Sequence, residues 1–238
     1  MRGLLVTGTD TGVGKTILSA CLIAAMAADG EPVRAYKPVL TGLEDEDRGN
    51  DGHGPSTPWP PDHELLAAAS GMTPEQVAPL RFGPAVSPHL AAKLAGRSIE
   101  PAELIAAAHE RGADATLIVE GVGGLLVPLT DSYTVADLAA DLALPLLIAA
   151  RPGLGTINHT LLTLQAARAG GLEVRAVVLT PWPAQPGAME LSNRDTIAHL
   201  GGVEVQTLAG LPGPDPVALA EAGSALPWRR WLGEHAIA

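Results

Sequence analysis

The 238-residue chain is long enough for one α/β domain, and its 47% hydrophobic residues can build a core although aromatics make up only 3%. A formal net charge of −11 at pH 7 argues against nucleic acid or an anionic membrane as the main partner. No apolar run approaches the ~18 residues of a membrane-spanning helix, no secretory signal follows Arg2, and the lone Cys21 cannot form an internal disulfide, so we expect a cytoplasmic protein.

The first predicted element is a buried strand over residues 4–6. It leads into a glycine-rich turn over residues 8–16, and an Ala- and Leu-rich helix follows over residues 17–28. Strand, glycine-rich turn, Lys-Thr and helix form the context in which a phosphate-binding loop is expected. Glycines let successive backbone N–H groups point at phosphate oxygens, and the start of the helix adds its own unpaired N–H groups.

Two side chains of this loop carry the expected chemistry. Lys15 would bring a positive charge to the outer phosphates, and the Thr16 hydroxyl would ligate Mg2+. The spacing departs from the standard phosphate-loop pattern, because Gly8 lies one residue early and Thr9 takes the position that usually holds glycine.

A second strand is predicted over residues 33–36 and ends at Lys37. Pro38 favours extended backbone at Lys37, so residues 37–42 should leave the sheet at the edge where ligands bind in open α/β sheets. Residues 44–61 are acidic and rich in Gly and Pro, which is typical of a mobile loop. Asp62 follows as an N-cap or first-turn residue of the next helix.

Helices and strands continue to alternate along the rest of the chain. Helices are predicted over residues 88–94, 101–111, 134–143, 156–168 and 189–200, and strands over residues 115–119, 146–149, 174–179 and 203–208. Trp228 and Trp231 should share one face of a short docked helix near the end. The alternation predicts an α/β fold: a single domain over residues 1–238 with one doubly wound, mainly parallel sheet flanked by helices.

The carboxyl ends of the predicted strands should form the site. Glu120 ends an apolar strand, and together with Thr16 and Asp62 it offers three oxygen ligands for one Mg2+. The alternative is a solvated glutamate beside a glycine turn. Lys37 is either a solvated strand-end lysine or a group that stabilises charge on a transferring phosphoryl group. No Ser–His–Asp set points to a covalent intermediate.

Five stretches of the chain together resemble the dethiobiotin synthetase family. They are residues 7–16, 37–42, 87–89, 119–129 and 154–160. The unusual spacing of the phosphate loop is the spacing of that family. The resemblance implies a fold of the P-loop NTPase type and a reaction that closes a cyclic urea on 7,8-diaminononanoate, with CO2, ATP and Mg2+, through a carbamate and a carbamic–phosphoric anhydride.

The resemblance also implies the site, residue by residue. Catalytic residues would be Lys37, Lys15 and Thr11. The nucleotide would be bound by Gly12, Val13, Gly14, Lys15, Thr16, Ile17, Asp62, Glu120, Gly121, Val122, Gly123, Thr180, Leu208, Ala209 and Gly210. The diamine substrate would be bound by Lys37, Thr41, Leu154, Gly155, Thr156 and Asn158. Mg2+ would be held by Thr16, Asp62 and Glu120. The segment that opens at Thr156 comes from the neighbouring subunit in the family, which implies a homodimer.

The motifs leave the nucleotide base and two alternative functions undecided. Thr180 stands where some relatives carry an Asn that reads adenine, so CTP or another nucleoside triphosphate could replace ATP. A partition-type switch ATPase is an alternative, although such proteins usually carry a second loop lysine where this chain has Asp10. Another ATP-dependent ligase of the phosphate-loop class is a second alternative. The amidoligases among them usually add a glutamine-hydrolysing domain with a nucleophilic cysteine.

Overall fold

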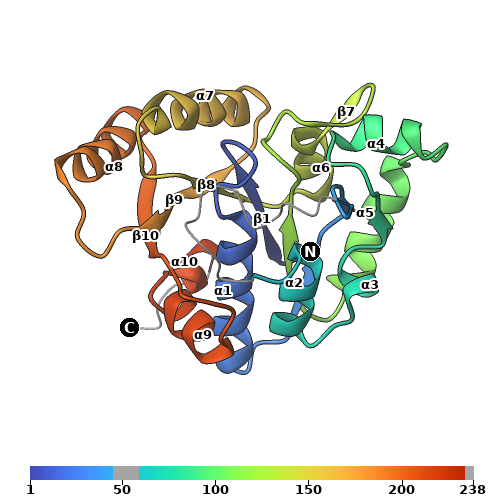
Figure 1. Cartoon of the computed structure of the whole chain (residues 1–238), viewed down its shortest axis with the longest axis horizontal. Helices are drawn as coiled ribbons and strands as arrows, with labels where there is room; N and C mark the ends of the chain where they lie inside the picture. Colours follow the sequence, from blue (N-terminus) through green and yellow to red (C-terminus); the bar gives the residue numbers. More distant parts are fainter. Residues whose placement is uncertain (45–58, 234–238) are drawn as a thin grey trace.

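A six-stranded parallel sheet forms the centre of the computed structural model, which describes residues 1–44 and 59–233 (Figure 1). Its strands, in spatial order, are β10 (Glu204–Ala209), β9 (Val174–Trp182), β8 (Leu146–Ala150), β1 (Gly3–Gly8), β5 (Thr116–Glu120) and β2 (Val33–Tyr36). Every neighbouring pair is parallel. The strand that precedes the phosphate loop, β1, therefore lies inside the sheet between β5 and β8.

Helices cover both faces of the sheet, as the sequence predicts. One face carries α1 (Lys15–Ala28), α2 (Asp62–Ser70), α9 (Pro216–Ser224) and α10 (Trp228–Trp231). The other carries α5 (Pro101–Arg111), α6 (Val135–Leu142), α7 (Thr156–Ala169) and α8 (Ala188–Gly201). Figure 1 shows α9 beside α1 and α7 beside α8.

The core follows from the alternation of side chains along buried strands. Leu4 and Val6 of β1 pack with α1, while Leu5 between them packs on the opposite face. All three are fully buried, which explains why β1 is a continuous apolar run. Cys21 of α1 is also fully buried, and burial raises the pKa of its thiol to about 12, so it behaves as a small core residue.

Several short elements lie outside the predicted alternation. The strand β3 (Val39–Leu40) pairs in parallel with β4 (Leu80–Arg81), and β6 (Pro128–Thr130) forms a hairpin with β7 (Tyr133–Thr134). Two short helices flank β4 in the chain: α3 (Pro74–Val77) precedes it and α4 (Pro88–Leu94) follows it. Of these only α4 was predicted. The segment after Lys37, predicted as a loop, is thus partly held in a two-stranded sheet.

Among the boundaries that differ from the sequence prediction, two bear on the site. The helix α1 starts at Lys15, because the phosphate loop runs directly into its first turn. The strand β9 continues past residue 179 through a cis Thr180–Pro181 bond to Trp182, where it still pairs with Ala209. The loop predicted from residue 181 therefore begins later.

The starts of two helices agree with the sequence prediction. Thr134 caps α6 in a capping box with Asp137, and Asp62 is the first residue of α2. Of the predicted acidic loop over residues 44–61, residues 45–58 lie outside the described residues. Across the two described ranges, no helix combines the length and the apolar sequence needed to cross a membrane.

Candidate active site

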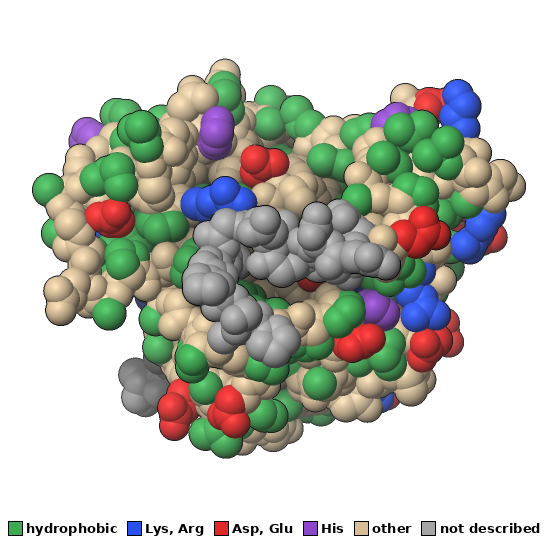
Figure 2. Space-filling view, in the orientation of Figure 1, with side chains coloured by type: hydrophobic (Ala, Val, Ile, Leu, Met, Phe, Trp, Pro, Cys, Tyr) green, Lys and Arg blue, Asp and Glu red, His purple; other side chains and the backbone are tan. Residues whose placement is uncertain are grey.

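The carboxyl ends of β1, β2 and β5 border a cavity of about 630 Å3. The phosphate loop, the segment after Lys37 and the start of α2 form its walls. Its lining includes these predicted site residues: Thr11, Gly12, Gly14, Lys15, Thr16, Ile17, Lys37, Thr41, Asp62, Val122 and Gly123. The face drawn in Figure 2 carries scattered acidic and basic side chains over its described residues rather than one continuous basic patch.

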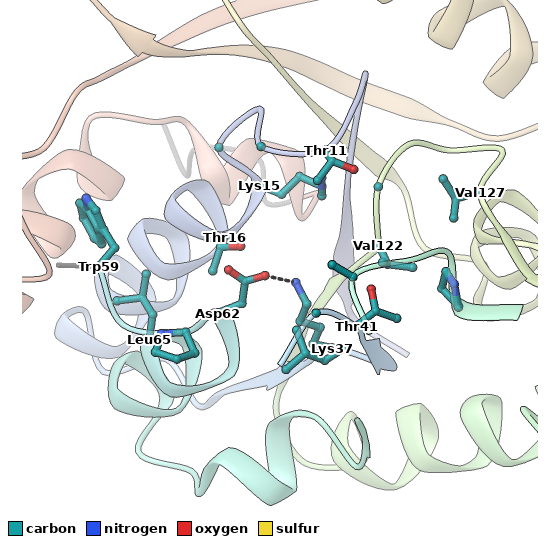
Figure 3. Close-up of a pocket in the computed structure, with 18 of the residues that line it drawn as sticks. Thr11, Lys15, Thr16, Lys37, Thr41, Trp59, Asp62, Leu65, Val122 and Val127 are labelled. Carbon is teal, nitrogen blue, oxygen red and sulfur yellow. Dashed lines mark hydrogen bonds and ion pairs between the residues drawn. The ribbon is translucent and has the colours of Figure 1, made fainter. Parts of the chain in front are cut away.

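Lys37 lines this cavity and is held between two carboxylates, Asp62 and Glu120. Figure 3 shows its contact with Asp62; Glu120 lies behind the cavity lining. Its Nζ lies 2.6 Å from Asp62 Oδ2 and 2.5 Å from Glu120 Oε1. Lys37 is only 3% exposed. Burial alone would lower the pKa of its ammonium, but the carboxylates of Asp62 and Glu120 outweigh that effect and raise the pKa. Lys37 is therefore a fixed positive charge at neutral pH.

The oxygens around Lys37 match the chemistry that Mg2+ requires. Thr16 Oγ1 donates to Glu120 Oε1 at 2.9 Å, so the Thr16 hydroxyl and Glu120 carboxylate are adjacent. Within the described part of the chain, the second carboxylate oxygen, Glu120 Oε2, is buried without a hydrogen-bond partner. A buried carboxylate oxygen that lacks a donor fits a cation. Thr16, Asp62 and Glu120 could therefore hold Mg2+.

The phosphate loop presents donors to the same cavity. Gly12 and Gly14 adopt the left-handed conformation, with φ of 67° and 92°. Gly14 precedes α1 and gives the first turn no side-chain cap, so backbone N–H groups of that turn face an incoming anion. Lys15 Nζ donates to the carbonyl of Asp10 at 2.9 Å, and burial lowers the pKa of its ammonium to about 8 against the opposing effect of Glu120.

Other predicted nucleotide residues lie around the loop rather than in the cavity. Val13 and Leu208 are buried in the core, while Ala209 and Gly210 are exposed at the end of β10. Thr180 is 2% exposed and packs directly on Gly14: a Cβ added to Gly14 would lie 2.6 Å from Thr180 Cγ2. The Thr180 side chain therefore supports the phosphate loop.

The predicted carboxylate-binding segment lies apart from the cavity. Leu154, Gly155 and Asn158 are exposed at the start of α7, Thr156 is buried, and none of the four lines the cavity that contains Lys37. The cavity also has lining residues to which the sequence analysis assigned no site role: Trp59, Leu65, Ala85, Val86, Ser87, Pro88 and Val127. Of these only Ser87, Pro88 and Val127 lie in motifs that the resemblance used.

Comparison with known proteins identifies the relatives of this chain. A family model described as an AAA domain matches residues 2–215. The ATP-dependent dethiobiotin synthetase BioD of Anaeromyxobacter dehalogenans (strain 2CP-1 / ATCC BAA-258) is 46% identical over 182 residues, which cover 75% of this chain and 76% of that protein. The protein of the same name from Mycobacterium sp. (strain JLS) is 39% identical over 224 residues, covering 91% and 92%.

A solved structure of chloroplast FtsY from Physcomitrella patens is 14% identical, with a TM-score of 0.48, and covers 93% of this chain and 64% of that one. The resemblance drawn from the five motifs agrees with the curated relatives, whose identity extends over most of the chain. The chain belongs to the ATP-dependent dethiobiotin synthetase family.

Proposed function

We propose that the protein closes the ring of dethiobiotin from 7,8-diaminononanoate and CO2, with conversion of ATP to ADP and phosphate. The observation that carries this proposal is the buried Lys37, held by Asp62 and Glu120 in a cavity that begins at the phosphate loop. A fixed cation next to a phosphate site suits a reaction in which negative charge moves from a carbamate to a phosphoryl group.

The reaction proceeds in three bond-forming steps. An amine of the substrate attacks CO2 and loses a proton, which forms a carbamate. A carbamate oxygen then attacks the γ-phosphorus of ATP, and the bond to the ADP oxygen breaks. The second amine attacks the carbonyl carbon of the mixed anhydride and loses a proton, the C–O bond to phosphate breaks, and phosphate leaves as the cyclic urea closes.

The residues of this chain act by position and charge rather than by covalent attack. Lys15 extends from the first turn of α1 into the cavity and would bind the outer phosphates. Lys37 would stabilise the carbamate and the transferring phosphoryl group. Thr11 would donate to phosphate, and Thr41 would hydrogen-bond the diamine or its carbamate; both line the same cavity.

Three oxygen-bearing residues would hold Mg2+: Thr16, Asp62 and Glu120. The metal, when bound, neutralises phosphate charge. Two of its proposed ligands, Asp62 and Glu120, are the carboxylates that contact the Lys37 ammonium, so the chain already places a cation beside them.

Base selection would depend on the ends of β9 and β10. Because Thr180 packs on Gly14, we infer that the backbone around Thr180 and the segment Leu208, Ala209 and Gly210 bind the base, with little side-chain discrimination. ATP is the expected nucleotide, and CTP or another nucleoside triphosphate would be accepted.

A homodimer would complete the substrate site. Gly155, in the left-handed conformation, precedes α7, so N–H groups of the first turn are available to a carboxylate. Since Leu154, Gly155, Thr156 and Asn158 lie outside their own chain's cavity, they would bind the diaminononanoate carboxylate in the cavity of a second copy. We propose that this dimer works in the cytoplasm.

A product assay tests the proposal. Purified protein with Mg2+, 7,8-diaminononanoate and labelled bicarbonate should yield label in an acid-stable cyclic urea, with one phosphate released per ring. Parallel reactions with ATP, CTP and GTP would measure base preference. Phosphate release without the diamine, and no cyclic urea with any nucleotide, would contradict the proposal and favour a switch ATPase.

A further inference from the structure

Arg151 contacts the phosphate loop from the end of a neighbouring strand. It directly follows β8, and its Nε and Nη2 donate to the carbonyl oxygen of Gly12 at 3.3 and 3.2 Å. Gly12 leaves little room on this side, since a Cβ added there would lie 3.0 Å from Arg151 Nη2. None of the roles assigned above includes this arginine.

The contact fixes the direction of one peptide group. The peptide between Gly12 and Val13 is planar and trans, so its C=O and N–H point in opposite directions. With the Gly12 carbonyl held on the Arg151 side, the Val13 N–H points away from Arg151. Among the described residues no acceptor bonds to this N–H, so it is available to a phosphate oxygen. A charged donor on the carbonyl also polarises the peptide and strengthens its N–H as a donor.

The backbone next to Arg151 is itself held in place. Asn193 of α8, 7% exposed, donates from Nδ2 to the carbonyls of Pro152 at 2.8 Å and Gly153 at 3.2 Å. No ion pair neutralises Arg151 within residues 1–44 and 59–233. Its full positive charge therefore remains beside the loop that would receive the nucleotide.

We propose that Arg151 is a positioning residue for the nucleoside triphosphate, acting through the Gly12–Val13 peptide. This inference rests on the nucleotide use proposed above. The role of Arg151 differs from the role proposed for Lys15. Arg151 would not contact the phosphates itself; it would set the shape and polarity of the phosphate loop, and so it would change the affinity for the nucleotide rather than the rate of the chemical step.

The test compares Arg151→Met, Arg151→Lys and the control Arg194→Met. Arg194 is a partly exposed arginine of α8 paired with Asp195, so its loss changes the net charge equally without touching the phosphate loop. Titration calorimetry with ATP and Mg2+ gives Kd, and steady-state assays give kcat and both KM values. Thermal melting of each variant establishes that it is folded.

Arg151→Met should raise Kd and KM for ATP about tenfold, the order expected when the charge-assisted contact with the Gly12 carbonyl is lost. Arg151→Lys should recover part of this loss, and Arg194→Met should match the wild type. The value of kcat at saturating ATP and the KM for the diamine should stay within about twofold.

An unchanged Kd for ATP in Arg151→Met would overturn the proposal. A rise confined to the KM for the diamine would also overturn it and would assign Arg151 to the substrate carboxylate. The binding measurement needs no turnover. A wild type that binds ATP but forms no cyclic urea would therefore contradict the proposed function while the Arg151 comparison still stands.

Discussion

At the scale of single residues, Lys37 is a buried ammonium that contacts two carboxylates. Its ammonium is desolvated, yet it stays charged because one carboxylate, Glu120, is almost fully buried with it and a second, Asp62, contacts it from the cavity side. The Lys37 ammonium also neutralises the charge of the two carboxylates. Without it, the negative charges of Asp62 and Glu120 would be left without this partner.

Lys37→Met should therefore cost both turnover and stability. We expect turnover to fall by about 10²–10³-fold, as for loss of one group that stabilises transition-state charge. The free energy of unfolding should fall by roughly 2–3 kcal/mol, less than for a fully buried pair because the Asp62 side chain is 43% exposed. Product assays and urea unfolding with and without Mg2+ measure both effects, and Mg2+ should recover part of the stability.

The control for this variant is Lys93→Met, which removes an exposed lysine from the last turn of α4. It should leave both quantities near the wild type. Turnover of Lys37→Met within a few fold of the wild type would remove Lys37 from the mechanism.

Motif spacing made some site residues predictable and left others hidden. Lys15 and Lys37 follow strands and Glu120 ends one, so their common edge could be inferred from the chain order alone. Arg151 was not predicted because it acts on a backbone carbonyl 139 residues away, and no local pattern marks such a contact. The packing of Thr180 on Gly14 depends likewise on tertiary structure.

Among the elements, α9 is the longer of two described helices that the sequence analysis missed, the other being α3. Its start carried a readable signal, since Asp215 caps the helix by accepting from the Ala218 N–H and Pro216 occupies the first position. The short strands β3 and β4 gave no such signal, because each is two residues long and its partner lies far along the chain. Apart from α9, the long helices and strands were found because their periodicity is local.

The packing of α9 on α1 depends on Gly223. A Cβ added there would lie 2.0 Å from the carbonyl oxygen of Cys21, which is backbone and cannot move aside. Gly223→Ala should therefore destabilise the protein by roughly 1–3 kcal/mol, as overpacking does. Gly213→Ala, with nothing within 4 Å of the added Cβ, is the matched control. Equal urea midpoints for the two variants would contradict this account of the interface.

At the scale of the whole molecule, sequence alone predicted the fold class but not the order of strands. In the observed order β1 lies between β5 and β8. This order depends on which strands that follow one another in the chain are also neighbours in the sheet. That information resides in the packing of distant segments. The predicted homodimer belongs to the same scale, because it concerns surfaces that a single chain leaves open.

Leu154 provides a test of the homodimer. It is 95% exposed at the turn before α7, and Leu162 on that helix is 55% exposed. Leu154→Asp should shift the protein toward monomer in sedimentation velocity and raise the KM for diaminononanoate about tenfold or more, because a charge would be buried in the contact. The control is Leu94→Asp on α4, which changes another exposed leucine, 62% exposed, outside the proposed contact. If Leu154→Asp leaves both the sedimenting mass and the KM for diaminononanoate unchanged, the contact between the subunits does not include Leu154.

The position of β1 has a consequence for biosynthesis. Residues 3–6 pair with residues 117–120, and residues 5–8 pair with residues 146–149. At about 5–20 residues per second, a ribosome needs roughly 7–28 seconds between making β1 and making β8. A fragment of residues 1–143 should accordingly show little ordered structure by circular dichroism. The nascent chain must stay soluble through that interval, and cellular nucleotide cannot stabilise it until more than half of the protein has been translated.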